Sequence, residues 1–357
     1  MAARLKLCIM CHVEDSYAWQ SSDGVRKKDP TAMGLGYLAT VTGANIGANG
    51  AKVSVQFGRN YLDQLYPGAP YPGTTYPGGP TSLRWVLGNG GNFWNHTHSA
   101  GYANLVSNWW TVSSAYASES PLAPTIDVAS SATAGRSGGA DPDNPGIDWA
   151  SISVAAGIKR INSNAANYYA CTPESLRPYK MSATDIDDGV YYHDIAPGPL
   201  YEGAPTTMRQ RPFWVNSASQ WDFKTSSTNP QEATVGSLLM IPHPSRYPFR
   251  QIAEGRGPYT TSLDTITQAD LDAAFTEVWS TYKQMELHQS NISNVWYLQI
   301  NPNLLANQVT GAPYAVVDSL GSWVQSINAL VNVPNSAVWM NMNEIASWYV
   351  EPQSAYY

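Results

Sequence analysis

The strongest constraint on the fold is a run of apolar residues near the amino terminus that turns polar abruptly. The run, RLKLCIMCHVED over residues 4–15, is rich in aliphatic side chains and ends in His12, Glu14 and Asp15. A short apolar run bounded by polar residues is typical of a strand buried within a sheet. We therefore predict a buried strand that carries these three side chains to its carboxyl end.

Strand-like and helix-like segments alternate along the rest of the chain, which indicates an α/β fold. Residues 29–47 have the pattern of a helix, and AKVSVQF at 51–57 that of the next strand. A β-α-β order implies parallel neighbours joined by a right-handed crossover. Further strands are predicted within 168–182, 235–245, 295–303 and 337–342, and further helices within 102–117, 146–165, 268–289, 312–331 and 343–350.

No shift in composition indicates a second core, so we predict one domain over residues 1–357. A single α/β barrel fits this alternation best. Loop excursions are expected near 66–80, 118–146 and 185–235. Barrels of this kind gather their chemistry at the carboxyl ends of the strands. The side chains predicted there are His12, Glu14, Asp15, His96, His98, Arg177, His243 and Asn301.

Composition narrows the class of ligand. Charged residues make up 13% of the chain, about half the roughly 25% of an average soluble protein. The net charge of −7, without a Lys/Arg run, argues against nucleic acid and against an anionic membrane surface. No stretch approaches 18 apolar residues, so no transmembrane helix is expected. The 13 Trp and 22 Tyr suit half-wet surfaces that stack on sugar rings, although burial in the core accounts for many of them.

The amino terminus and the cysteines bear on the compartment. The segment MAARLKLCIMC is too short and too charged for the apolar part of a signal peptide. Either the protein is cytosolic, or the chain starts after a removed signal; low Lys with abundant Ser, Asn, Tyr and Trp favours secretion. Cys8 and Cys11 in one strand would lie about 10 Å apart, beyond disulfide reach. Two alternatives remain: either Cys8 or Cys11 forms a disulfide with Cys171, or all three cysteines are buried free thiols.

Two histidines one residue apart, His96 and His98, lie in the run GNFWNHTHSAGY at 91–102. In an extended chain residues i and i+2 point to the same face, so both rings could share a cation. Zinc bound by two nitrogens and one oxygen, with an open position for water, is a common hydrolytic arrangement. Asp15 and Glu14 could divide the roles of metal ligand and proton acceptor. Alternatively, both are solvated residues at the start of a loop.

Taken together, these motifs resemble the polysaccharide deacetylases of carbohydrate esterase family four. HVED stands where that family has Thr-Phe-Asp-Asp, and NHTH resembles the start of its His-(Ser/Thr)-x-x-His motif. LRPY approximates Arg-Pro-Pro-Tyr, and VWYLQIN resembles the late strand that ends in a catalytic His. The resemblance implies a distorted (β/α) barrel of about seven parallel strands. It also implies a divalent metal, with Zn²⁺ as the expected ion, and hydrolysis of acetyl groups on N- or O-acetylated sugars.

The resemblance also implies roles for single residues. Glu14 would be the catalytic base, and Arg177 would orient its carboxylate. Asp15 and His96 would bind the metal. The second histidine comes two residues after the first instead of four, so either His98 is the third ligand or the ligand comes from elsewhere.

The last catalytic position of the family holds Asn301 in this chain. A histidine acting as general acid would then be His243, His12 or His193; His243 is also the alternative third ligand. We expect the substrate-binding residues to be Trp94, Trp109, Tyr179 and Asn301.

These observations lead to one function and two alternatives. The first is a metal-dependent deacetylase whose partner is a carbohydrate substrate. The second is a polysaccharide-cleaving glycoside hydrolase on the same barrel, which needs two carboxylates about 5–10 Å apart. The third is a non-catalytic glycan-binding protein, which is favoured because Asn301 stands where the family has its catalytic His. The carboxylates open to the second are Glu14, Asp15, Asp185, Asp187, Asp188 and Glu254.

Overall fold

The structure is a computed structural model that describes the sheet and the helices packed on it. The described residues are 5–13, 34, 37–38, 50–57, 92–96, 135–137, 160–163, 213–217, 220–222, 238–242, 249, 252, 263–288, 294–307, 312–331, 333–334 and 336–350.

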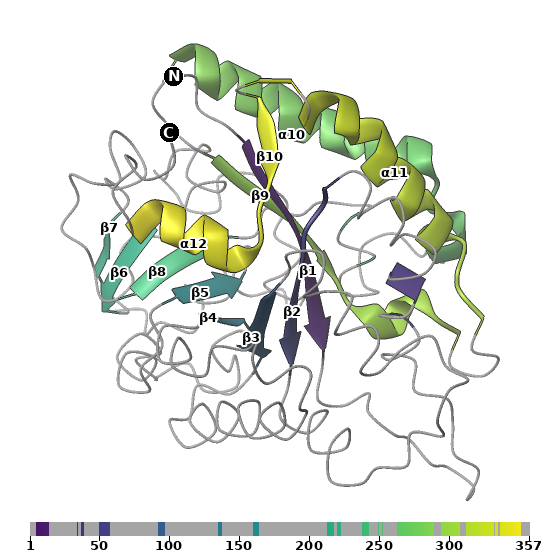
Figure 1. Cartoon of the computed structure of the whole chain (residues 1–357), viewed down its shortest axis with the longest axis horizontal. Helices are drawn as coiled ribbons and strands as arrows, with labels where there is room; N and C mark the ends of the chain where they lie inside the picture. Colours follow the sequence, from purple (N-terminus) through teal and green to yellow (C-terminus); the bar gives the residue numbers. More distant parts are fainter. Residues whose placement is uncertain are drawn as a thin grey trace, which may run out of the picture.

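The described strands form one ten-stranded sheet in which β1 pairs with three other strands (Figure 1). β9 pairs with one edge of β1, while β10 and β2 share the other edge. From β2 the order continues β3-β4-β5-β8-β6-β7. Every pair is parallel except β8–β6 and β6–β7. The strands are β1 (Leu5–Val13), β2 (Val53–Phe57), β3 (Asn92–His96), β4 (Gly135–Ser137), β5 (Arg160–Ser163), β6 (Phe213–Ser217), β7 (Gln220–Asp222), β8 (Leu238–Pro242), β9 (Asn294–Ile300) and β10 (Ala337–Trp339).

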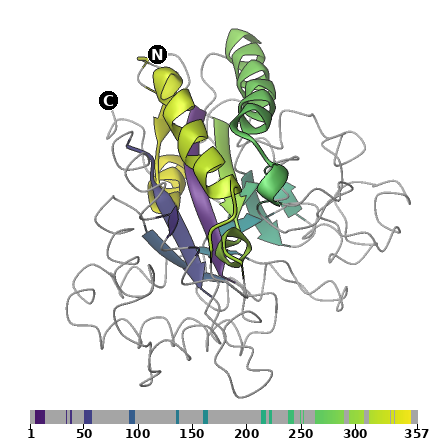
Figure 2. The same ribbon diagram turned by 90° about the vertical axis from the view of Figure 1, so that its right-hand side faces the viewer.

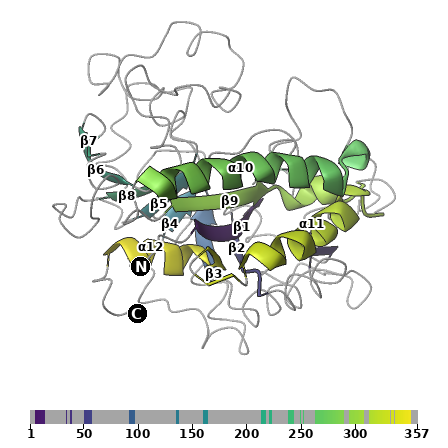
Figure 3. The same cartoon turned by 90° about the horizontal axis from the view of Figure 1, so that it is seen from above.

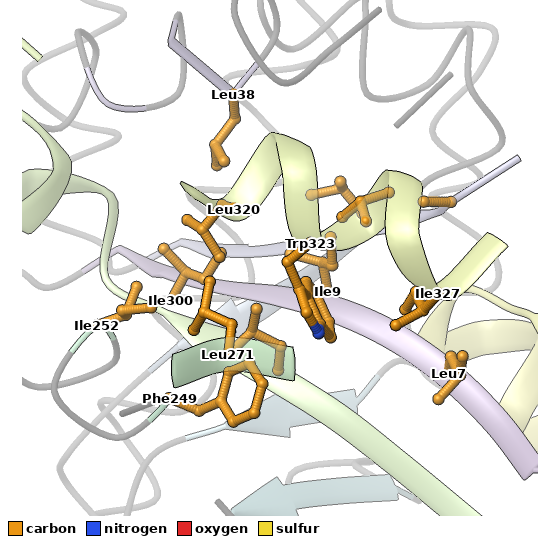
Figure 4. Close-up of a cluster of buried hydrophobic side chains, with 14 of the residues drawn as sticks. Leu7, Ile9, Leu38, Phe249, Ile252, Leu271, Ile300, Leu320, Trp323 and Ile327 are labelled. Carbon is orange, nitrogen blue, oxygen red and sulfur yellow. The ribbon is translucent and has the colours of Figure 1, made fainter. Parts of the chain in front are cut away.

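Two long helices cover one face of the sheet, called here the outer face. Figure 2 shows α11 (Val316–Val331) in front of β1, with α10 (Gln268–His288) to one side of it. Leu7 and Ile9 of β1 alternate onto this face and are buried against apolar side chains of both helices (Figure 4). The 3-10 helices η7 (Leu263–Thr265) and η8 (Pro302–Leu305) also contribute apolar residues to this core.

Large aromatic rings fill the centre of the outer-face core. Trp296 of β9 and Trp323 of α11 are both fully buried, with ring centroids 5.9 Å apart. Phe249 and Phe275 contact both rings edge-on, at centroid distances of 5.0–5.8 Å. Edge-to-face pairs of this kind add to the hydrophobic gain from burial. This core is the larger of the two buried apolar clusters in the described part of the chain.

The opposite face of the sheet, called here the inner face, is curved. Cys8 and Met10 of β1 pack in one cluster with Ile241 of β8, although β1 and β8 are not paired. Tyr297 of β9 donates a hydrogen bond to the Ile241 carbonyl at 3.4 Å. α12 (Met342–Val350) contributes further side chains to the same cluster; Figure 3 shows this helix apart from α10 and α11. The sheet therefore bends around the inner face.

Polar contacts fix the start of α12 on the inner side. The amide of Glu344 donates to Asn341 Oδ1 at 2.9 Å, and the amide of Asn341 donates to Glu344 Oε2 at 2.8 Å. This reciprocal pair is a capping box, which satisfies amide groups at a helix start. Glu344 also forms an ion pair with Lys52, and the amide of Met342 donates to Ser54 Oγ at 3.0 Å.

The predicted alternation of strands and helices is confirmed in most of the described segments, including every α-helix and strand after residue 267; η7 and η8 were not predicted, and η8 lies where the strand predicted over 295–303 ends early. The sheet is largely parallel, as predicted, and no pair among the described strands closes it into a barrel. The helix predicted over 146–165 is wrong at its end, where residues 160–163 form β5. The excursions predicted at 118–146 and 185–235 contain β4, and β6 with β7, respectively.

Two smaller expectations also have outcomes. Cys8 and Cys11 are free and buried in β1, so neither is bonded to Cys171. None of the described helices has both the length and the apolar character needed to cross a bilayer.

Candidate functional site

The carboxyl ends of three adjacent parallel strands define the candidate site. β1 ends at Val13, β2 at Phe57 and β3 at His96, and β2 alone separates the other two. Glu14 and Asp15 follow directly after β1. Neighbouring strands lie about 4.8 Å apart, so the ends of β1 and β3 are separated by roughly 10 Å. Two segments predicted to hold the metal thus end at the same edge of the sheet.

A row of buried polar residues crosses the sheet at this edge. His12 of β1 is the register partner of Gln56 of β2. On the other side, Cys11 pairs with Ile300, so His12 and Asn301 are the next residues of that register. Asn301 has an extended backbone, with φ −98° and ψ 108°, and thus continues the alternation of β9 onto the inner face. We call Gln56, His12 and Asn301 the amide–imidazole row; their exposed fractions are 0%, 4% and 6%.

The inner face becomes less polar from this edge as far as Cys8; beyond it, Lys6 of β1 is again polar and buried. Two residues before the amide–imidazole row along each strand, Met10 pairs with Ser54 on one side and Gln299 on the other. Two residues earlier again, Cys8 pairs with the buried Tyr297. Buried amides and an imidazole are therefore concentrated at the carboxyl edge, where parallel α/β sheets bind their ligands.

Asn301 has a buried side-chain oxygen that no described residue satisfies with a hydrogen bond. Within the described part of the chain, Asn301 Oδ1 accepts no hydrogen bond. The backbone amide of the same residue donates to the Ile252 carbonyl at 3.3 Å, which holds the residue in place. Leaving a buried acceptor unsatisfied costs about 1–3 kcal/mol. Such groups in native proteins call for an explanation, and a bound ligand is one.

The buried cysteines near the site are poor nucleophiles. Burial raises the pKa of the Cys8 thiol to about 12, although its hydrogen bond to Ser54 acts in the opposite direction. Burial raises the pKa of Cys11 as well, and the neighbouring Cys8 adds to this shift. Because the thiolate is the reactive form, neither residue is suited to nucleophilic or metal-ligand chemistry at neutral pH.

The structure describes three of the ten residues predicted to act in catalysis, metal binding or substrate binding, and also His12, an alternative general acid. Asn301 lies in the amide–imidazole row. Trp94 and His96 lie in β3, and His96 is its last residue. His96 is the register partner of Ser137. The other predicted site residues lie outside the described residues: Glu14, Asp15, His98, Trp109, Arg177, Tyr179 and His243. Within the described part of the chain, no three His, Cys, Asp or Glu side chains are grouped closely enough to hold a metal.

Gln56 and Gln299 belong to this face but were not predicted from the sequence. Each is a polar residue near the end of an otherwise apolar strand, in VSVQF and VWYLQI. That position was the available signal. It is weak, because a glutamine carries no titratable group that would single it out for catalysis.

Comparisons with known proteins give only distant similarities. No family model and no curated protein matches the chain. Among solved structures, proteins described as polysaccharide deacetylases from Mycobacterium smegmatis and Pseudomonas aeruginosa PAO1 are 9% and 10% identical, each with a TM-score of 0.49. Each alignment includes 98% of this chain, together with 91% of the Mycobacterium smegmatis chain and 92% of the Pseudomonas aeruginosa chain.

A GH57 branching enzyme from Thermococcus kodakaraensis is 8% identical with a TM-score of 0.49, covering 99% of this chain and 72% of its own. Similarity at this level does not establish a shared family or activity. The functional conclusion therefore rests on the residues of the chain itself.

Proposed function

We propose that this protein is a metal-dependent hydrolase that removes acetyl groups from an N- or O-acetylated polysaccharide or oligosaccharide. The observation that carries the proposal is the edge shared by β1 and β3. HVED passes through the end of β1, and the first histidine of NHTH is the last residue of β3. The two motifs that most resemble those of the polysaccharide deacetylases thus begin in strands that end at the same edge of the sheet, with β2 between them.

The proposed donor set fits zinc. Imidazole nitrogens and a carboxylate oxygen are ligands that Zn²⁺ accepts in hydrolytic sites. Asp15, His96 and His98 would hold the ion, with His243 as the alternative to His98. When bound, such an ion supplies Lewis acidity and a water of lowered pKa.

The protein groups would carry the proton chemistry and hold the sugar. Glu14 takes the proton of the attacking water, and Arg177 orients its carboxylate. His243 returns a proton to the leaving group. Trp94, Trp109, Tyr179 and Asn301 bind the sugar, through aromatic faces and an amide. Closure of the sheet into a distorted barrel of about seven strands, and secretion of the protein, belong to the same proposal.

Two measurements test the proposal. Acetate release is followed across acetylated chitin, galactosamine polymers and xylan, with and without EDTA; release that EDTA abolishes supports it. Metal content is measured for the wild type, for His96→Ala and for His288→Ala. His288 ends α10, which leads into the start of β9 and thus ends at the opposite edge of the sheet.

We expect about one zinc per chain in the wild type and in His288→Ala, and its loss in His96→Ala. Chain shortening without acetate release would instead identify a glycoside hydrolase. Glycan binding without metal or turnover would identify the non-catalytic protein, which asparagine at position 301 favours.

A further inference from the structure

We propose that the amide–imidazole row, Gln56, His12 and Asn301, is a hydrogen-bonding subsite for a neutral polar group of the carbohydrate. This inference rests on the proposed function and deepens it. It adds Gln56 and His12 to the groups that hold the substrate, and it assigns Asn301 to recognition.

The register determines how the row is arranged. His12 lies between two carboxamides, one on each neighbouring strand. The three residues therefore span two strand spacings, roughly 10 Å, along one line at the carboxyl edge. A sugar ring with its substituents is of similar size. Extended backbone at all three positions makes the row rigid, so little ordering is needed on binding.

The chemistry of the row favours a neutral ligand. A carboxamide offers both a donor and an acceptor, which matches hydroxyl and amide groups equally. No described residue of the row is a carboxylate, a lysine or an arginine. A charged ligand buried there would lose its hydration without a full opposite charge, which is costly. Hydroxyl and acetamido groups are neutral and carry both donor and acceptor functions.

The unsatisfied oxygen of Asn301 indicates that a donor comes from a ligand. The residue is 94% buried, from its exposed fraction of 6%, and Oδ1 has no hydrogen-bond partner within the described part of the chain. An apolar residue of similar size would avoid this cost. A residue retained for ligand binding and a residue retained for folding therefore respond in opposite ways to replacement by leucine.

The test combines ligand binding with thermal stability. Asn301→Leu and Gln56→Leu are compared with Gln325→Leu, which replaces an exposed glutamine on α11. Binding is measured by calorimetry with tetra-N-acetylchitotetraose, acetylated galactosamine oligomers and acetylated xylo-oligosaccharides. Each is paired with its deacetylated form, so that recognition of the acetyl group is separated from recognition of sugar hydroxyls. Melting temperature is measured for every variant.

We expect Asn301→Leu to weaken binding about tenfold or more while its melting temperature is unchanged or raised. Gln56→Leu should also weaken binding, and Gln325→Leu should not. Equal loss for acetylated and deacetylated forms assigns the row to sugar hydroxyls, and selective loss for acetylated forms assigns it to the acetyl group.

Unchanged binding in folded Asn301→Leu and Gln56→Leu would overturn the inference, as would a wild type that binds none of these sugars. A fall in melting temperature with unchanged binding would make the row structural. Acetate release that these variants retain in full would leave the proposed function standing without this subsite. Weakened binding in these variants, combined with no acetate release by the wild type, would support the subsite and contradict the proposed function.

Discussion

The two faces of β1 differ in what covers them and in what they are suited to do. On the outer face, Leu5, Leu7, Ile9 and Cys11 alternate into a core that two long helices close with aromatic rings. On the inner face, the core is apolar at Cys8 and Met10 but becomes polar at His12, the last residue of β1 whose burial is described. The same strand thus supports folding with one face and presents hydrogen-bonding groups with the other.

The comparison shows where substitutions should cost stability and where they should cost function. A fully buried ring contributes through its contacts, and its loss leaves a cavity. A buried amide without a partner contributes little to folding, and its loss is tolerated. The outer face is therefore expected to be sensitive in denaturation experiments, and the carboxyl edge of the inner face in binding experiments.

The largest effect is expected on the outer face. Trp323→Ala removes a fully buried ring that contacts Phe249, Phe275 and Trp296, and should lower the free energy of unfolding by about 3–5 kcal/mol. Denaturation by urea measures this loss. Trp279→Ala, on the partly buried side of α10, is the matched control and should cost less. Equal losses in the two variants would contradict the assignment of this core.

An intermediate effect is expected where the two faces meet. A Cβ on Gly34 would lie 1.8 Å from the carbonyl oxygen of Pro302, the residue after Asn301. Gly34→Ala should therefore displace that backbone, at a cost of about 1–3 kcal/mol, and should weaken sugar binding through Asn301.

Gly50→Ala is the control for this variant. Gly50 has φ 71° and open space around it, so alanine is strained there by about 1–2 kcal/mol without touching Pro302. Urea denaturation and calorimetry should show a comparable loss of stability in both variants and a loss of binding in Gly34→Ala alone. Unchanged binding in Gly34→Ala would show that Pro302 can move without disturbing Asn301.

The last effect, which is absent at neutral pH and appears only above about pH 9, sharpens the comparison on β1 itself. Burial raises the pKa of Cys8 from 9.0 to about 12, so the folded state keeps this proton where the unfolded state releases it. The stabilisation is complete below pH 9 and is lost as pH rises towards 12. The expected loss is about 1.4 kcal/mol per pH unit at most.

Urea denaturation between pH 8 and pH 11 measures this slope, which should be shallower in Cys8→Ala than in the wild type. Labelling with iodoacetamide provides a second measurement. Both thiols should resist labelling in the folded protein at pH 8 and react after unfolding. Rapid labelling of Cys8 or Cys11 in the folded protein, located by peptide mass spectrometry, would show that β1 is accessible to solvent.

The strands that sequence predicts correctly are those whose own residues determine their environment. LKLCIMCHV and VWYLQI are apolar enough to be buried on both faces, which identifies a buried strand from composition alone. The helix predicted over 146–165 fails at RINS because four residues without a distinctive periodicity take the conformation that neighbouring strands impose.

The candidate site divides in the same way. The end of β1 and the histidine at the end of β3 could be recognised because carboxylates and histidines carry catalytic chemistry by their type. Gln56 could not, since its role depends on lying beside His12, 44 positions away in the sequence but adjacent in the sheet.

The sequence by itself determined the α/β alternation, the burial of β1 and the chemical character of the strand ends, because these follow from local composition and periodicity. Only the tertiary structure decided that Gln56, His12 and Asn301 form one row on one face. Register is set by pairing between distant segments, and a shift of one residue would move each of these side chains to the opposite face.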